Sequence, residues 1–421
     1  MSKGELILKR IKDNKVIDSY YYEELTLNLE EKKRIKTEFL DTNEYKLICN
    51  CKSNIEMKID KNFKRIYPKE QGLKHNDGCP RSNTNSIYNK AWKVDEITGE
   101  TSVRVDFSLN PNKIYEDKPE NSLVDTEDNK RIFPKNNFQS DGKVTVSALV
   151  KNLNSQAWRR KAFKRYNFSD KFEFWKTVCY GESNLINLNS TAMVNGKKTK
   201  NLREMLFEPY KAIDVKNKET RFAYMYLSSF KDLNNGNFEL ICVYQKGNGE
   251  ISEYKFIVTY GKFYNALESS NLSIDALVSG DFIVSGFVFR NKFNRIEFFE
   301  LAIIRCSKYG LFSESSHEAE FYTMLSDNNK IFFKPNKPVP NYEKYIPDAI
   351  LLEDNVCKEV FIEIFGFNSE EYRGEMNNKI SLVENELKDT HVLIYWDVLN
   401  ETMPTIDMIN LTLNKIKINK L

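Results

Sequence analysis

Two runs of the sequence indicate a fold most clearly: Pro347-Asp348-Ala349-Ile350-Leu351-Leu352 and Val360-Phe361-Ile362-Glu363-Ile364-Phe365-Gly366. Both are short and apolar, which is typical of strands buried in a sheet. Asp348 opens the first run and Glu363 lies late in the second, with 14 residues between the two carboxylates. Because neighbouring strands lie about 4.8 Å apart, the two side chains can meet on one sheet.

The elements around these runs follow the order helix, three strands, helix, strand. We expect a helix over Ser316–Ser326, capped by Ser316, and a strand over Lys330–Lys334 before the two runs. A helix over Glu370–Glu386 and a strand over His391–Trp396 follow them. This order, with carboxylates on consecutive strands, resembles the PD-(D/E)xK, or restriction-endonuclease-like, nucleases. The resemblance covers about a quarter of the chain and implies a nuclease domain over residues 311–421.

The residue types agree with metal-dependent hydrolysis of a phosphodiester. A hard divalent cation offsets charge on the phosphate and lowers the pKa of the attacking water, and Mg²⁺ needs only one or two carboxylates. Asp348 and Glu363 are the expected ligands of Mg²⁺ or Mn²⁺. Glu318 shares the apolar face of its helix with Phe321 and Leu325, and the resemblance implies that this helix acid assists the metal.

One position departs from the pattern of these nucleases. The third strand should end in Glu-x-Lys, but Phe365 stands where the lysine is expected. In some members of the superfamily this group lies on the following helix, where Lys379 is our candidate, with Tyr372 and Arg373 as alternatives. The predicted catalytic residues are Glu318, Asp348, Glu363 and Lys379. The opposite interpretation is a decayed nuclease fold that is kept for DNA binding or assembly.

A second group of metal-binding residue types lies near the N-terminus. Cys49-Asn50-Cys51 is followed, after 23 residues, by His75 and then by Cys79-Pro80. Three thiolates and one imidazole suit a tetrahedral structural zinc, which would add folding stability to a small β-rich module. Because Cys-x-Cys is less diagnostic than Cys-x-x-Cys, reduced structural cysteines beside a surface histidine are the alternative.

A basic segment lies in the middle of the chain. Between Gln156 and Lys176 the sequence has seven basic and two acidic residues, whereas the net charge of the whole chain is only +3. Aromatic residues are interleaved, and a helical face of this kind can follow phosphates and stack bases. The expected contacts to DNA come from Arg159, Arg160, Lys161, Lys164 and Arg165. The alternative is a solvated helix whose aromatic side chains face the core.

The mixture of helical and strand patterns along the chain predicts an α+β protein. Its 421 residues are enough for several domains, and 13% aromatic with 29% charged residues is a globular profile. The predicted units are an N-terminal α+β module with the zinc knuckle over 1–115, a linker or long loop over 116–142, a helical basic segment over 143–215, a β-rich domain over 216–310 and the nuclease-like domain over 311–421. No membrane span or secretory signal is evident, and the seven mostly isolated cysteines fit a reducing cytoplasm.

The whole chain also resembles a bacterial protein family that is often carried on plasmids and integrative elements. The resemblance rests on Tyr45-x-x-x-Cys49-x-Cys51, His75-x-x-x-Cys79-Pro80, Val144-Thr-Val-Ser-Ala-Leu149 and Glu363-x-x-Gly366. It implies an association with mobile DNA and no particular activity. The sequence as a whole therefore predicts Mg²⁺- or Mn²⁺-dependent hydrolysis of DNA in a mobile-element or defence context. The rival is a non-catalytic DNA-binding or assembly protein.

Overall fold

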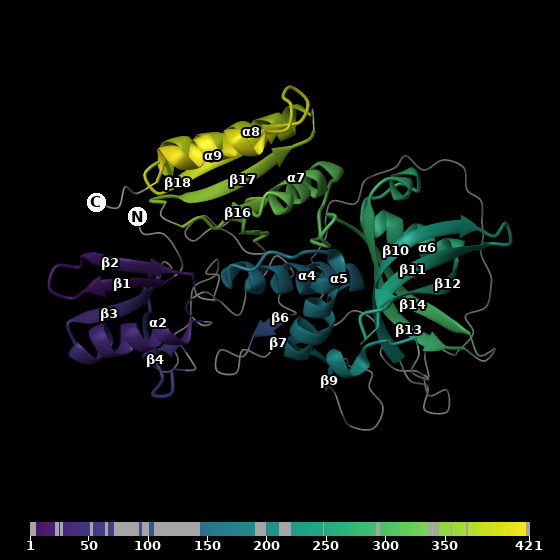
Figure 1. Cartoon of the computed structure of the whole chain (residues 1–421), viewed down its shortest axis with the longest axis horizontal. Helices are drawn as coiled ribbons and strands as arrows, with labels where there is room; N and C mark the ends of the chain where they lie inside the picture. Colours follow the sequence, from purple (N-terminus) through teal and green to yellow (C-terminus); the bar gives the residue numbers. More distant parts are fainter. Residues whose placement is uncertain are drawn as a thin grey trace.

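The computed structural model describes residues 6–21, 25, 28–50, 54–63, 66–70, 92–94, 101–104, 144–189, 199–209, 220–246, 248–291, 295–335, 339, 345–354, 356–367 and 369–417. Figure 1 shows an N-terminal sheet at one end of the molecule and a strongly curved sheet at the other. The C-terminal sheet and the long helix α4 lie between these two ends. The protein is thus an α+β chain built from several sheets.

The N-terminal part is a five-stranded antiparallel sheet with the order β2-β1-β3-β4-β5. Its strands are β1 (Leu6–Arg10), β2 (Val16–Tyr20), β3 (Tyr45–Cys49), β4 (Glu56–Ile59) and β5 (Ile66–Pro68). Helix α2 (Leu29–Arg34) continues into a π-helical turn (Ile35–Phe39) and a 3-10 turn (Leu40–Thr42). The apolar residues of these elements form a core of their own. This module therefore has an apolar core separate from that of the following segments.

The helical part of the chain lies against a small mixed sheet with the order β6-β7-β8-β9. Its strands are β6 (Trp92–Val94), β7 (Thr101–Arg104), β8 (Ile186–Asn189) and β9 (Thr199–Asn201). The helical elements are α4 (Val146–Phe163), α5 (Lys171–Lys176), a π-helical turn (Thr177–Gly181) and two 3-10 turns (Glu182–Leu185 and Arg203–Met205). Thr145 and Asp170 cap α4 and α5, since each side chain accepts from backbone N–H groups of the first turn. Strands β7 and β8 are parallel, so segments before and after α4 share this sheet.

The β-rich part is a five-stranded antiparallel sheet with the order β12-β11-β10-β13-β14. Its elements are β10 (Thr220–Asp232), β11 (Asn237–Gln245), β12 (Ile251–Thr259), α6 (Tyr260–Ser269), a 3-10 turn (Asp275–Val278), β13 (Asp281–Arg290) and β14 (Ile296–Cys306). The first half of β10 pairs with β13 and the second half with β11, with a bulge between Leu227 and Ser229. Such a bulge bends the strand and increases its twist.

This sheet curls until its edge strands approach each other. Phe256 of β12 and Phe298 of β14 have ring centroids 4.6 Å apart, although other strands lie between β12 and β14 in the sheet order. Helix α6 lies beside this seam, because the Lys262 ammonium donates to the carbonyl oxygen of Phe298. The arrangement is a five-stranded antiparallel sheet curled into a partly open barrel. A fold of this kind hosts many functions, so its ligand has to be argued from its side chains.

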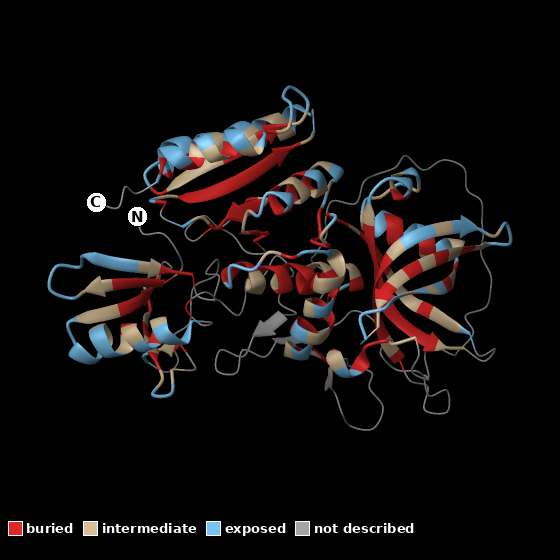
Figure 2. Cartoon of the chain, in the orientation of Figure 1, coloured by how far each residue is buried: buried red, intermediate tan, exposed pale blue. Residues whose placement is uncertain are grey.

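The C-terminal part contains a four-stranded mixed sheet with the order β15-β16-β17-β18. Its elements are α7 (Ser316–Asp327), β15 (Phe332–Phe333), β16 (Ala349–Leu351), β17 (Glu359–Phe365), α8 (Glu370–Ser381), a π-helical turn (Leu382–Glu386), β18 (His391–Asp397) and α9 (Ile406–Lys415). Strands β17 and β18 are parallel and the other neighbours are antiparallel. Figure 1 shows α8 and α9 on one side of the sheet and α7 on the other. Strand β17 is buried along its whole length (Figure 2).

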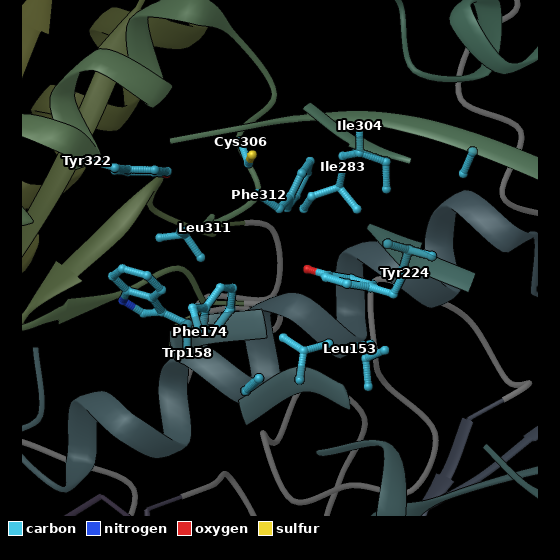
Figure 3. Packing of buried hydrophobic residues seen from close by; sticks show 14 of the residues in the cluster. Leu153, Trp158, Phe174, Tyr224, Ile283, Ile304, Cys306, Leu311, Phe312 and Tyr322 are labelled. Carbon is cyan, nitrogen blue, oxygen red and sulfur yellow. The ribbon is translucent and has the colours of Figure 1, made fainter. Parts of the chain in front are cut away.

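One continuous hydrophobic core joins α4, the barrel and the C-terminal sheet. Figure 3 shows Trp158 and Leu153 of α4 with Phe312 and Ile304 from the barrel side and Tyr322 from α7. The Trp158 indole N–H donates to the backbone oxygen of Phe332 over 2.9 Å, which fixes α4 to β15. The predicted units 143–215, 216–310 and 311–421 therefore share a core, which the sequence did not indicate. The predicted linker over 116–142 lies outside the described residues.

Most expected elements are present, with differences at their ends. Ser315 and not Ser316 caps α7, and the strand expected over Lys330–Lys334 is reduced to two residues of β15. Helix α9 was not expected. The apolar sequence around Cys179, Cys242, Cys306 and Cys357 predicts four buried thiols. This is confirmed for the first three and wrong for Cys357, which is exposed. In the described part of the chain, no helix has both the length and the apolar character needed to cross a membrane.

Candidate functional site

The two carboxylates of the opening runs meet at neighbouring strands. Asp348 immediately precedes β16, and one oxygen of its side chain, Oδ2, accepts a hydrogen bond of 2.7 Å from the backbone N–H of Ile364 in β17. Glu363 lies beside that residue on β17, with only 1% of its side chain exposed. The register of β16 against β17 pairs Ala349 with Ile362, which brings both carboxylates to the same part of the sheet. The proximity expected from the sequence is confirmed.

Their surroundings disfavour ionisation of both groups. Desolvation raises the pKa of Asp348 well above its ordinary value, and the negative charges of Glu363 and Glu318 raise it further. Desolvation also raises the pKa of Glu363, although the Lys379 ammonium opposes the shift. Neighbouring buried carboxylates whose pKa values are raised create a local field that favours a cation.

Lys379 of α8 contacts the Glu363 carboxylate of β17. Its ammonium donates to Glu363 Oε2 over 2.8 Å, and it lies 5.9 Å from the ring centroid of Phe365. Desolvation lowers the pKa of this lysine, but the attraction of Glu363 outweighs it, so the net shift is upward. The charge on α8 therefore lies beside the ring that occupies the usual lysine position. Of the alternatives, Arg373 pairs with Asp397 over 2.5 Å and Tyr372 packs its ring against Phe365 and Phe367.

Glu318 is buried as expected, but it is already paired. The ammonium of Lys334 donates to Glu318 Oε2 over 2.6 Å, and both side chains are at least 90% buried. The Tyr322 hydroxyl lies 3.2 Å from the same oxygen and 2.7 Å from the backbone oxygen of Asp348. Burial lowers the pKa of Lys334, yet the attraction of Glu318 and of the other acids raises it overall. Glu318 is thus linked to Asp348 through Tyr322.

Two further lysines at this site were not expected from the sequence. Lys334 follows the two phenylalanines of β15, and a lysine at the end of a buried strand is the signal that could have identified it. Lys151 comes from α4, and its ammonium lies 4.9 Å from the ring centroid of Phe312. Burial lowers the pKa of Lys151, and it lies within electrostatic range of Glu314, whose pKa Lys334 and Lys151 lower. The helix α4 therefore contributes one cation to the edge of the site.

The donor atoms present fit a magnesium-type cation at Asp348 and Glu363. Glu363 Oε1 is buried and has no hydrogen-bond partner of normal geometry within the described ranges, and the same is true of the Tyr345 hydroxyl near it. A buried carboxylate oxygen without a partner is costly unless something such as an ion satisfies it. No group of three or more acidic, histidine or cysteine side chains that could hold a metal is found among the residues with defined positions. A two-carboxylate site is nevertheless sufficient for Mg²⁺, which keeps several waters.

The five basic residues expected to contact DNA are placed very differently from one another. Arg159 is buried with its guanidinium 4.7 Å from the ring centroid of Phe333, which does not favour a contact to phosphate. Arg160 pairs with the buried Glu182 over 2.8 Å, and Arg165 pairs with Asp354 over 2.8 Å. Lys161 and Lys164 are half-buried and exposed, respectively. Contact between this helix and DNA stays a prediction, which these two lysines support best.

Three of the four residues expected to bind zinc cannot be placed. Cys51, His75 and Cys79 lie outside the described residues. Cys49 is buried at the end of β3, and its backbone N–H donates to the oxygen of Ile55 over 2.8 Å. The structural zinc stays a prediction.

The sequence matches no protein-family model, and no curated protein is significantly similar to it. Function therefore has to be inferred from the geometry of the candidate site.

Proposed function

We propose that this protein is a divalent-metal-dependent phosphodiesterase that acts on DNA through Asp348 and Glu363. The observation that carries the proposal is the pair of carboxylates on adjoining strands, each with a raised pKa. Within the described part of the chain, one buried oxygen of Glu363 has no hydrogen bond of normal geometry, although the Tyr345 hydroxyl interacts with this carboxylate. When bound, Mg²⁺ or Mn²⁺ would supply charge neutralisation at the phosphate and a water of lowered pKa. The order α7-β15-β16-β17-α8-β18 is consistent with the restriction-endonuclease-like fold that we propose for this domain.

The chain's own residues have separate roles in this proposal. Asp348 and Glu363 hold the cation, and Lys379 provides positive charge on the side of α8. Lys334 neutralises Glu318, so Glu318 acts mainly by holding Tyr322 against the backbone of Asp348. Glu318 is therefore a positioning residue here and not a metal ligand.

The first experiment is a cleavage assay on plasmid, linear duplex and single-stranded DNA with Mg²⁺ or Mn²⁺. We expect cleavage by the parent protein and none by Asp348→Asn or Glu363→Gln, because without the cation the attacking water keeps its ordinary pKa and the charge on the phosphate is not neutralised by a metal. Asp354→Asn is a matched control, since this carboxylate follows β16 and is 73% exposed. Its activity should equal that of the parent. Metal binding without cleavage of any DNA would contradict the proposal.

A second candidate is a non-catalytic DNA-binding or assembly protein that has no metal requirement. Phe365 favours it, because this ring stands in place of the usual lysine, and Lys379 and Lys334 already neutralise two of the acids. Titration with Mn²⁺ separates the two candidates. A non-catalytic protein should show no Mn²⁺ binding that is lost when Asp348 or Glu363 is changed.

The DNA contact is tested separately from cleavage. Lys161→Ala combined with Lys164→Ala should weaken binding to all DNA sequences alike and reduce its salt dependence, if α4 contacts phosphates. Arg160 is left unchanged, because its removal would leave Glu182 buried without its ion-pair partner. The association with mobile DNA that the whole-chain resemblance implies belongs to this proposal as its biological setting.

A further inference from the structure

The seam of the barrel contains a cavity that the proposed cleavage does not use. It has a volume of about 360 Å³ and lies where β12, the start of α6, the end of β13 and the start of β14 meet. Cavities of this size accept small ligands or part of a larger one. The cavity is therefore large enough for a group the size of a phosphate together with part of what carries it.

Positive charge dominates the lining of this cavity. Its charged residues are the four cations Lys255, Lys262, Arg290 and Arg295 and one acid, Glu297. The carboxylate of Glu297 accepts a hydrogen bond of 2.5 Å from the Asn291 side chain. Lys255 forms a 3.3 Å ion pair with Glu239 of β11, in which the lysine side chain is 57% exposed, and such exposed pairs contribute little. Even if Glu239 and also Glu300, whose charge acts on Lys262, are counted, the cations exceed the acids by one.

The inner wall of the cavity is also short of negative charge. Burial lowers the pKa of Lys262, because the desolvated ammonium is only partly compensated by Glu297 and Glu300. Its ammonium donates to a backbone oxygen, that of Phe298, over 2.6 Å and not to a carboxylate. Thr259 is the N-cap of the ten-residue helix α6 and Lys262 lies in its first turn, where the N-terminal end of the helix adds a partial positive charge.

We propose that this seam cavity binds a phosphate group carried by a nucleotide or by a single strand of nucleic acid. Two arginines and two lysines around a small opening suit a phosphate better than a carboxylate, because arginine matches its oxygens in pairs and phosphate carries more charge. Lys255 and Arg295, which line the cavity, are exposed, so a ligand can reach this part of it from solvent. This inference does not depend on the proposed cleavage, since none of its residues belongs to the carboxylate site.

The test measures binding by the full chain in a chelator, so that cleavage does not interfere. A fluorescent oligothymidylate is bound at about 50 mM salt and then displaced with inorganic phosphate, a mononucleotide or unlabelled oligothymidylate. Lys255→Ala combined with Arg295→Ala should weaken binding on the order of tenfold and reduce the slope of log affinity against log salt by about one to two. Both side chains are exposed, so thermal unfolding of this variant should match that of the parent.

Lys246→Ala combined with Lys308→Ala is the matched control, because it removes two cations that do not line the cavity. Its affinity should stay within about twofold of the parent. Displacement by the mononucleotide identifies a nucleotide site, and displacement by the oligonucleotide alone identifies a strand site; either supports the proposal. Equal affinities of the parent and the cavity variant, or equal losses in both double variants, would overturn it. If the parent protein binds the oligothymidylate as expected but cleaves no DNA, the proposed function at the carboxylate site fails and the proposal for the cavity stands.

Discussion

At the scale of single residues, Asp348 and Glu363 identify the candidate site, because burying two neighbouring carboxylates lowers the stability of the fold. Desolvation is the main cause that raises the pKa of both carboxyls. The charges of Glu363 and Glu318 raise the pKa of Asp348 further, and the charge of Glu318 raises that of Glu363. Such an arrangement destabilises the protein at neutral pH unless a cation is bound. Function is the ordinary reason for keeping groups of this kind.

We expect Asp348→Asn to raise the free energy of unfolding by about 1 kcal/mol at pH 7.5 in a chelator. Asparagine removes the disfavoured charge and can still accept from the N–H of Ile364. A carboxyl whose pKa is raised on folding stabilises the fold below its ordinary pKa of about 4, and that contribution is lost as pH rises through the raised value. The stability difference between Asp348→Asn and the parent should therefore widen from pH 4.5 to 8.5 in denaturant titrations.

The control for this experiment is Asp354→Asn, for which the difference should not widen with pH. Saturating Mn²⁺ should stabilise the parent, by about 2.7 kcal/mol at 100 times its Kd, and should not stabilise Asp348→Asn. A flat difference across this range of pH would show that Asp348 is not desolvated in solution.

Lys379 can be tested by moving its charge back to the strand. If it serves in place of the missing lysine, Lys379→Ala should lower cleavage by about 10²–10⁴-fold, as expected for one acid–base or charge-stabilising group. Lys379→Arg should recover little, because a planar guanidinium does not replace a compact ammonium. Phe365→Lys in the Lys379→Ala background should restore part of the rate, since the ring and the ammonium are neighbours. Unchanged cleavage by Lys379→Ala would rule out this role.

At the scale of elements, α4 is the part on which the site's geometry depends most. Asn154 of α4 is fully buried, and its side-chain amide donates to the Tyr224 hydroxyl over 2.9 Å and to the oxygen of Gly310 over 2.8 Å. Its oxygen accepts from the N–H of Phe312 over 2.8 Å. Gly310 has a φ of +91°, and a Cβ there would collide with Tyr226. One side chain thus ties α4 to the barrel and to the segment that leads into α7.

We expect Asn154→Ala to destabilise the protein by about 3 kcal/mol, because three buried polar groups lose their partner at once. The transition temperature should fall by roughly 6–12 °C for a unit of this size. Asn167→Ala is the control, since its side chain donates to the oxygen of Ser326 at a more exposed position. Its cost should stay near 1 kcal/mol. If Asn154→Ala and Asn167→Ala lowered the transition temperature equally, the hydrogen bonds of Asn154 would not make the expected contribution to stability.

At the scale of the whole molecule, the described residues form two separate cores. One belongs to the N-terminal sheet and α2, and the other joins α4, the barrel and the C-terminal sheet. Loss of the first core therefore need not disturb the carboxylate site, whereas damage to α4 should affect the barrel and the site together.

We expect one tightly bound zinc per chain, held by Cys49, Cys51, His75 and Cys79. Elemental analysis should give about one equivalent. Strong chelation should increase hydrogen exchange in residues 6–70 and leave β17 protected, because β17 belongs to the other core. Less than half an equivalent of zinc, with exchange unchanged by chelation, would contradict this prediction.

The sequence alone determined the local elements and the pairing of the two carboxylates. Periodicity and apolar runs identify strands such as β13 and β17, and a carboxylate in an apolar run is visible without coordinates. The proximity of Asp348 and Glu363 follows because consecutive strands of similar polarity tend to pair. Lys379 could be proposed only through the resemblance, because some nucleases of this superfamily carry the corresponding group on the helix that follows the strand.

Only the tertiary structure decided which charges are already neutralised and which segments share a core. Lys334 meets Glu318, Arg160 meets Glu182 and Lys151 reaches the site from α4, and each pair is separated by a stretch of chain whose path no local pattern fixes. The closure of the barrel, and with it the basic seam cavity, depends on the summed twist and bulge of five strands. Local propensity is set by neighbours along the chain, whereas these contacts are set by packing among residues that are far apart in it.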